Sequence, residues 1–182
     1  MPSRSGLPLA ATIVVGILAM RCAVNAQEPV AAPDPFGPVT FLIGRWEGTS
    51  DGRPGKGSVR REYSRALNSR FIRVVNRSEY APQERNPKGE IHEDESFLSY
   101  DRVRKRLVIR QFHTEGFVNH YVQDPGSGLV FTSEAIENIP AGWRARETYV
   151  ARGPDEFEEI FELAEPGKPF EVYSRATLKR VK

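Results

Sequence analysis

Cysteine is almost absent from this 182-residue chain, and the single one, Cys22, lies within the first 26 residues. The remainder therefore has no disulfide and no thiolate metal ligand, and its stability must come from packing. Net charge is lacking as well. The first 26 residues hold two of the 26 basic residues and none of the 24 acidic ones, so the rest of the chain is neutral. A neutral chain has no electrostatic footprint for nucleic acid or an anionic membrane.

Long hydrophobic runs are lacking too, apart from 14 residues between Leu7 and Met20. A bilayer span needs about 20 apolar residues. Because Arg4 precedes this run and the small-residue pattern VNA follows it at 24–26, residues 1–26 are predicted to be a signal peptide, cleaved before Gln27. We therefore expect a periplasmic or secreted protein; the alternative is an uncleaved anchor. A Pro/Ala-rich linker over 27–40 and one domain over 41–182 would follow.

No long amphipathic helix is indicated anywhere in that domain. From Arg45 onward apolar and polar residues alternate with period two, which predicts half-buried strands. The predicted strands cover 45–50, 57–67, 70–80, 91–101, 106–115, 117–124, 129–137, 143–151, 156–164 and 170–181. Short turns rich in Gly, Pro and Asn make neighbours antiparallel. The predicted fold class is all-β, a single antiparallel up-and-down β-barrel of about ten strands, because closure removes both exposed edges.

The segment FLIGRWEGTSDG, from Phe41 to Gly52, places a tryptophan between two glycines at the start of the first strand. A short helical turn, then Gly-x-Trp, then the first strand of a meander barrel resembles the lipocalin-like (calycin) folds. That resemblance implies a short N-terminal helical plug, with Trp46 packed across one end of the barrel. It also implies an arginine from the last strand over Trp46, for which Arg180 is the first candidate and Arg175 the second. Gly44 would permit the tight corner between helix and strand.

The segments REYSRALNSRFIRV and GEIHEDESFLSYD are similar to those of secreted bacterial barrels related to the nitrobindins. IHEDESFL is similar to a His-x-Glu segment of that family, with His92 as its histidine and Asp94 where the family has glutamate. Nitrobindins bind haem through a histidine near the C-terminus, whereas this chain has no histidine after His120. We therefore expect no cofactor, and the resemblance leaves a haem barrel acting on nitrogen oxides as the alternative function.

Histidines are the first candidate ligand contacts. Alternation places His92 and Asp94 on one face of their strand, where a metal ion would need a further ligand from His113 or His120. No metal is expected, because a polar strand face in water is the plainer explanation. His113 and His120 flank the turn TEG, so the hairpin could bring them together at a ligand, a haem or a catalytic base. Two solvent-facing side chains are the alternative.

Arg146, Tyr173 and Arg175 are the second group of candidate ligand contacts. An internal Arg and Tyr can fix a carboxylate inside a barrel, because the guanidinium presents a planar fork to two oxygen atoms. Pairing of these arginines with the glutamates of 156–164 on the outer face is the plainer alternative.

Catalytic motifs are lacking: the chain has no Gly-x-Ser-x-Gly elbow and no phosphate-cradling glycine loop. The sequence therefore does not indicate an enzyme. The expected function is an extracytoplasmic lipocalin-like barrel whose partner is a small apolar or amphipathic molecule. Its expected contacts are His92, His113, His120, Arg146, Tyr173 and Arg175.

Overall fold

A computed structural model describes residues 34–182, so the expected signal peptide over 1–26 and the start of the linker lie outside the described residues. A 3-10 helix, η1, spans Gly37–Leu42. The ten strands are β1 (Gly44–Gly52), β2 (Gly57–Ala66), β3 (Phe71–Tyr80), β4 (Glu90–Asp101), β5 (Arg106–His113), β6 (Val118–Gln123), β7 (Val130–Glu137), β8 (Arg144–Gly153), β9 (Glu156–Ala164) and β10 (Glu171–Arg180). Among the described residues, no helix is long and apolar enough to cross a membrane.

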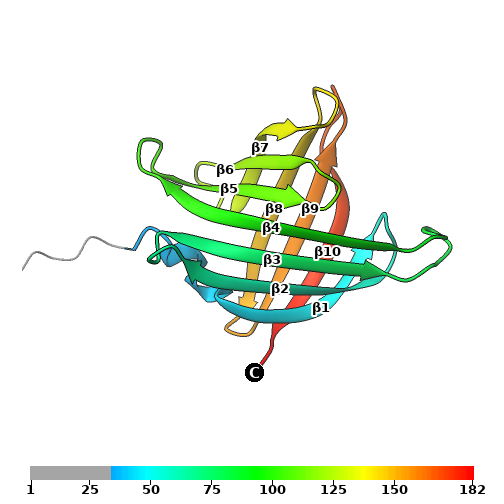
Figure 1. The fold of residues 1–182 in the computed structure, drawn as a ribbon, viewed down its shortest axis with the longest axis horizontal. Coiled ribbons are helices and arrows are strands. Elements are labelled where there is room, and N and C mark those ends of the chain that lie inside the picture. The colour runs from blue at the N-terminus through cyan, green and yellow to red at the C-terminus, as the bar shows by residue number, and fades with distance from the viewer. Residues whose placement is uncertain (1–33) are drawn as a thin grey trace, which may run out of the picture. The chain divides into compact units, whose positions relative to one another are not determined.

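The strands form one closed antiparallel barrel in which each strand pairs with its neighbours in sequence (Figure 1). The pairing of β1 with β10 closes the barrel, from Trp46 opposite Arg180 to Gly52 opposite Ser174. This confirms the all-β fold class predicted from the period-two alternation. Closure explains how a ten-strand sheet in a chain of this size avoids two exposed edges.

The interior at one end of the barrel is apolar and centred on Trp46. Trp46 is 1% exposed, and its Nε1 donates a hydrogen bond to the carbonyl oxygen of Leu42 at 2.7 Å. Its ring meets Phe157 edge-on, with 4.8 Å between the ring centroids. The helix η1 begins at Gly37, four residues before the expected domain start, and buries Val39 and Leu42 in the same core cluster. We call this region the Trp46 end.

Arg180, near the end of β10, covers the Trp46 ring with its guanidinium carbon 4.2 Å from the ring centroid. The guanidinium also donates hydrogen bonds to the carbonyl oxygens of Ile43 at 2.7 Å and Phe41 at 2.8 Å. The C-terminal strand is thereby bound to the segment that links η1 with β1. A side chain that both stacks on the ring and satisfies two carbonyls holds the first and last strands of the barrel together.

The glycines on either side of Trp46 lie where residues of β10 come close to the backbone of β1. Gly44 has φ +130°, and a Cβ there would lie 2.7 Å from an Nη of Arg180. At Gly48, a Cβ would lie 1.9 Å from the carbonyl oxygen of Thr177 on β10. A side chain at either position would push β10 away from β1. The Gly-x-Trp-x-Gly pattern is therefore a requirement of barrel closure at this point.

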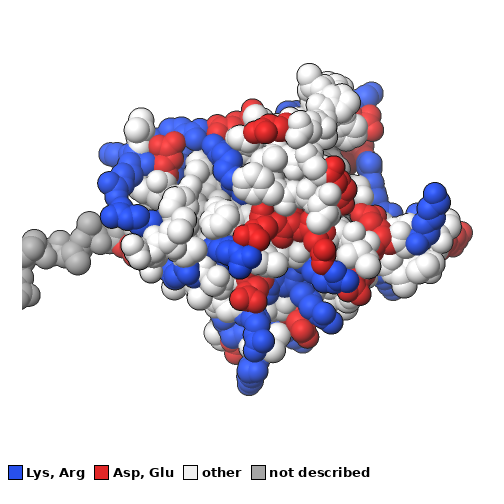
Figure 2. Space-filling view, in the orientation of Figure 1, with Lys and Arg blue, Asp and Glu red and all other residues white. Residues whose placement is uncertain are grey.

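The outer face carries charges of both signs in alternation, as the visible side of the molecule shows (Figure 2). Cross-strand ion pairs account for this mixture. Arg73 on β3, for example, donates two hydrogen bonds to Glu95 on β4, at 2.6 and 2.8 Å. Such exposed pairs contribute little to stability, each about 0–1 kcal/mol.

The pairing of β7 with β8 is the shortest in the barrel, with three residue pairs from Val130–Thr148 to Thr132–Arg146. Beyond it, the backbone N–H of Ala145 donates to the hydroxyl of Ser133 at 2.8 Å, so a side chain replaces the next backbone acceptor. The remaining residues of β7 pair with β6. The two strands therefore diverge, and the loop between them lies beside the cavity described next.

Candidate functional site

The other end of the barrel encloses a cavity of about 540 Å³. Ser50 and Ala176, which face each other on β1 and β10, line this cavity, four residues along each strand from Trp46 and Arg180. A volume of this size is typical of sites for small organic molecules. The barrel therefore has one packed end and one hollow end.

Six apolar side chains form one group in the lining of the cavity. They come from the loop after β5, from β7 and the loop after it, and from β9. They are Phe117, Ile136, Ile139, Trp143, Phe161 and Leu163, which we call the apolar rim. A rim of this kind provides contact area for the hydrocarbon part of a ligand.

The inner wall of the cavity is polar, and we call it the polar floor. Its side chains are Arg61, Asn76, Asp94, Gln111, Asn119 and Glu159. The central interaction is a two-pronged ion pair, in which Arg61 donates to the two carboxylate oxygens of Glu159 at 2.8 and 3.2 Å. Burial alone would lower the pKa of Arg61, but the Glu159 carboxylate outweighs it and raises that pKa. Arg61 therefore keeps its charge inside the barrel.

Asp94 organises the amides of the polar floor. Its Oδ1 accepts hydrogen bonds from Asn76 at 2.9 Å and from Gln111 at 3.0 Å. The side-chain oxygens of Asn76 and Asn119 are buried and have no hydrogen-bond partner among the described residues. Burying an oxygen atom without a hydrogen-bond partner costs free energy, because the atom gives up its hydrogen bonds to water. The floor thus has acceptor capacity that the protein itself does not use.

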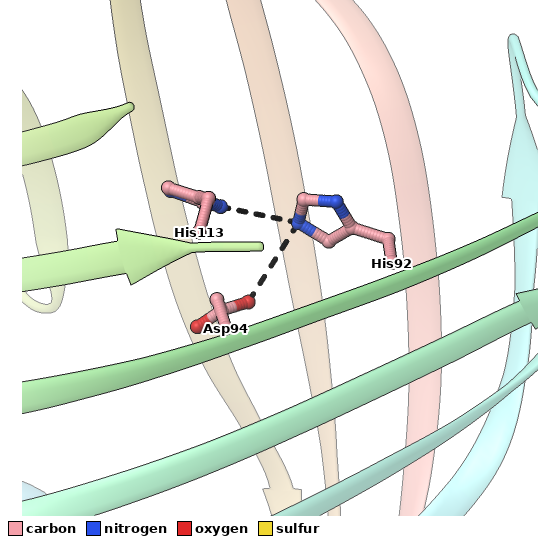
Figure 3. Close-up of side chains that lie close together, drawn as sticks. All are labelled: His92, Asp94 and His113. Carbon is pink, nitrogen blue, oxygen red and sulfur yellow. Dashed lines mark hydrogen bonds and ion pairs between the residues drawn. The ribbon is translucent and has the colours of Figure 1, made fainter. Parts of the chain in front are cut away.

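Two histidines complete the polar side of the cavity. Figure 3 shows the imidazoles of His92 and His113 and the carboxylate of Asp94 turned toward one another. Nδ1 of His113 lies 3.2 Å from Nε2 of His92, and Nδ1 of His92 lies 2.8 Å from Oε1 of Glu115. On its other side, Nε2 of His113 accepts from Nδ2 of Asn119 at 3.0 Å. This orders the protons: Asn119 donates to His113, His113 to His92 and His92 to Glu115.

His113 is neutral at physiological pH. Burial, and to a lesser extent the neighbouring His92, lower the pKa of His113 from 6.5 to about 3. Its ring also stacks on Phe117, with 3.9 Å between the centroids. A neutral, stacked imidazole keeps a lone pair available for a proton, a hydrogen bond or a metal ion.

Below the floor lies a buried carboxyl, Glu147 on β8. Burial and the Glu159 carboxylate raise the pKa of Glu147 from 4.5 to about 8. Its carboxyl group accepts a short hydrogen bond from the Tyr149 hydroxyl. Glu147 is therefore largely protonated at neutral pH, which avoids a second negative charge beside Glu159.

Three of the sequence-predicted contacts do not line the cavity. His120 lies on the outer face, because the register of β5 with β6 pairs Phe112 with Val118 and turns Asn119 inward instead. The imidazole of His120 contacts Glu137 at 2.6 Å. The expected meeting of His113 with His120 is therefore wrong, and His113 meets His92 from β4.

The arginines also differ from the expectation for internal anion ligands. Arg146 donates to both oxygens of Glu162, at 2.6 and 2.7 Å, and Arg175 pairs with Glu158 at 3.4 Å. These are the outer-face pairs given as the alternative. Tyr173 does line the cavity, because a β-bulge between Val172 and Ser174 separates it from the face of Arg175.

Sequence reasoning missed the polar floor, although a signal for it exists. Its residues occupy inward positions of their strands, and the two that form the ion pair lie between apolar residues two positions away on either side. Arg61 lies between Val59 and Tyr63, and Glu159 between Phe157 and Phe161. A charged residue at a position where the period-two alternation points into the barrel must be paired inside it.

Comparison with known proteins supports the fold. No protein-family model and no curated protein sequence matches the chain. Among solved structures, Rv2717c from M. tuberculosis is similar, with a TM-score of 0.61 and 18% identity over 82% of this chain and 99% of that one. A de novo designed fluorescence-activating β-barrel matches with a TM-score of 0.42 and 11% identity over 78% and 94% of the two chains. At these identities, the comparison shows that this chain has a β-barrel fold similar to that of Rv2717c.

Proposed function

We propose that this protein is an extracytoplasmic binding barrel that holds one small amphipathic molecule. The observation that carries the proposal is the polarity of the cavity of about 540 Å³, which has an apolar rim and a polar floor. A ligand would place its polar group on the floor and its hydrocarbon part against the rim. The lipocalin-like resemblance of the sequence agrees with this function.

The charge of the floor limits the polar group of the ligand. Arg61 is already neutralised by Glu159, so it offers no free cation to a carboxylate. Among the described residues that line the cavity, the unpartnered buried oxygens are those of Asn76 and Asn119, and they accept hydrogen bonds. The favoured ligand is therefore neutral and donates N–H or O–H groups, as a hydroxyl or a primary amide does.

The haem alternative has less support from the arrangement of the histidines. The histidines that line the cavity, His92 and His113, share ring nitrogens with each other and with Glu115 and Asn119. An axial iron ligand would have to leave at least one of these hydrogen bonds. Haem binding would therefore require a rearrangement of these hydrogen bonds.

Binding can be tested with Nile red, a neutral dye that fluoresces in apolar sites. Trp143 lies at the rim and serves as a second reporter, because energy transfer or quenching follows ligand contact. The wild-type protein should bind one dye molecule per chain. A long-chain primary alcohol and a long-chain primary amide should displace the dye, and a fatty acid of equal length should do so more weakly.

The decisive variant is Ala176→Phe, which fills the cavity from β10. It should reduce dye affinity at least about tenfold, while overpacking costs about 1–3 kcal/mol of stability. The matched control is Ala151→Phe, the same change at an exposed position of β8, which should leave binding unchanged. Equal dye binding by wild type and Ala176→Phe would show that the cavity is not the site. Stoichiometric haem uptake with a sharp Soret band would favour the haem alternative.

A further inference from the structure

We propose that His92, Asp94 and His113 form a site for one divalent transition-metal ion, with Zn²⁺ as the best match. The site lies on the cavity wall, where β4 and β5 run side by side (Figure 3). This proposal does not depend on the ligand proposed above.

The distances between the donor atoms are those of a tetrahedral site. With bonds of about 2.0–2.1 Å to Zn²⁺, two ligand atoms of a tetrahedron lie about 3.3 Å apart. Nδ1 of His113 and Nε2 of His92 are 3.2 Å apart, and Nε2 of His92 lies 3.8 Å from Oδ2 of Asp94. One donor atom from each of the three residues lies within 4.8 Å of the others. Small side-chain rotations would therefore suffice to bring all three to one ion.

The carboxylate of Asp94 is already oriented for this role. Its Oδ1 is fixed by hydrogen bonds from Asn76 and Gln111. No hydrogen bond from a described residue reaches Oδ2, the oxygen that faces His92. The Asp94 side chain is 5% exposed. A buried carboxylate with one fixed oxygen and one free oxygen is suited to bind a cation through the free atom.

Glu115 orients His92 from outside the site. Its carboxylate accepts from Nδ1 of His92 at 2.8 Å, which leaves the Nε2 lone pair directed at the proposed ion. Carboxylate–histidine pairs of this kind accompany metal-bound imidazoles, because they fix both the tautomer and the ring orientation. Asp94 and Glu115 together also balance the two charges of the ion.

Asn119 provides the corresponding contact for His113. When Nδ1 of His113 binds the ion, its proton moves to Nε2, which then becomes a donor. A half-turn of the Asn119 amide would present Oδ1 to that proton. This oxygen is the buried atom that has no hydrogen-bond partner among the described residues in the metal-free arrangement, and Asn119 is 1% exposed. The half-turn would pair this oxygen with His113, and it would move Nδ2 of Asn119 away from its present acceptors on Gln111 and Tyr121.

Three protein ligands leave a fourth position of the tetrahedron, and it faces the cavity. Sites of this type accept a water molecule or a lone pair from a bound molecule at the open position. Oxygen and nitrogen donors on a cavity ligand would thus bind in direct contact with the ion. The metal would add an electrophilic centre to the polar floor.

The test uses the metal alone. Residues 27–182, freed of bound metal with a chelator, should bind one Zn²⁺ per chain in isothermal titration calorimetry. Co²⁺ should give the intense visible bands of a tetrahedral centre. His113→Gln and Asp94→Asn should each weaken Zn²⁺ binding at least about tenfold and abolish the Co²⁺ bands.

The matched control is His120→Gln, which removes a histidine from the outer face. It should leave the stoichiometry, the Zn²⁺ affinity and the Co²⁺ spectrum unchanged. Far-ultraviolet circular dichroism and the urea midpoint identify a variant that fails to fold, and Asp94→Asn retains the shape of the side chain if His113→Gln does not fold. Absence of one-site Zn²⁺ binding by the wild type, or equal binding by a folded Asp94→Asn protein, would overturn the proposal. Dye binding by the chelator-treated protein reports on the cavity separately.

Discussion

The two ends of the barrel interior are built from the same strands but from opposite kinds of side chain. At the Trp46 end, Trp46 and Phe157 pack without space between them, and η1 adds Val39 and Leu42. At the other end, the same strands carry Arg61, Asp94 and Glu159 around a cavity. A change of a few positions along each strand therefore converts a packed core into a polar site.

In a small barrel that has no disulfide, this difference assigns stability to one end and a polar site to the other. Close packing at one end supplies the free energy of unfolding. Buried ion pairs and unpaired amide oxygens at the other end contribute little or cost stability. The hollow end can exist because the packed end offsets that cost.

The largest effect should come from removing the centre of the packed end. Trp46→Ala deletes a 1% exposed side chain and its hydrogen bond to Leu42, so it should lower the free energy of unfolding by about 3–5 kcal/mol. Urea unfolding followed by circular dichroism measures the loss. The control is Phe112→Ala on β5, where the ring is 50% exposed and the cost should be below about 1 kcal/mol. An unchanged midpoint for Trp46→Ala would contradict the claim that packing at the Trp46 end stabilises the barrel.

The next effect tests the hollow end. Arg61→Met leaves the Glu159 carboxylate buried without its partner and should cost about 3 kcal/mol. The double variant Arg61→Met, Glu159→Leu should recover most of that loss, because two apolar side chains replace two charges. Urea midpoints of both singles and the double give the coupling free energy. Additive losses would contradict the ion pair as the organising contact of the floor.

Arg180→Ala should have a smaller effect at the packed end. It removes the cation over Trp46 and the hydrogen bonds to Phe41 and Ile43, with an expected cost of about 1–2 kcal/mol. Thermal and urea unfolding measure it. Arg175→Ala, on the same strand but paired with Glu158 on the outer face, serves as the control and should cost below about 1 kcal/mol. Equal losses in the two variants would remove the special role of Arg180.

The smallest effect is a pH dependence that arises from Glu147. Its pKa is raised from 4.5 to about 8 in the folded protein, so between these values the folded state binds more protons than the unfolded state. The contribution of Glu147 to stability is therefore complete below pH 4.5 and is lost as the pH rises to 8. Between pH 7 and pH 8, one pH unit, the wild-type protein should lose about 1 kcal/mol of stability, and Glu147→Gln should remove this loss. Urea midpoints at pH 5, 7 and 8 test the sign, and a wild-type slope in the variant would contradict it.

The barrel could be predicted from the sequence because alternation, turn residues and the Gly-x-Trp segment all act over a few neighbouring positions. The pairing of side chains in the polar floor could not, because its contacts join residues far apart: Arg61 pairs with Glu159 across 98 positions. His113 was matched with His120 because only the turn between them is visible locally. The register of two hairpins decides that its actual neighbour is His92.

The short pairing of β7 with β8 has a consequence for motion. A barrel opens locally where the fewest backbone hydrogen bonds must break, and three residue pairs join these strands. The hydroxyl of Ser133 holds the next position through one side-chain hydrogen bond to Ala145. Amide hydrogens along this seam should therefore exchange with solvent before those of β2 to β4. Opening here would part the wall of the cavity sideways, between Ile136 and Trp143, so a molecule inside could be exchanged without unfolding the barrel.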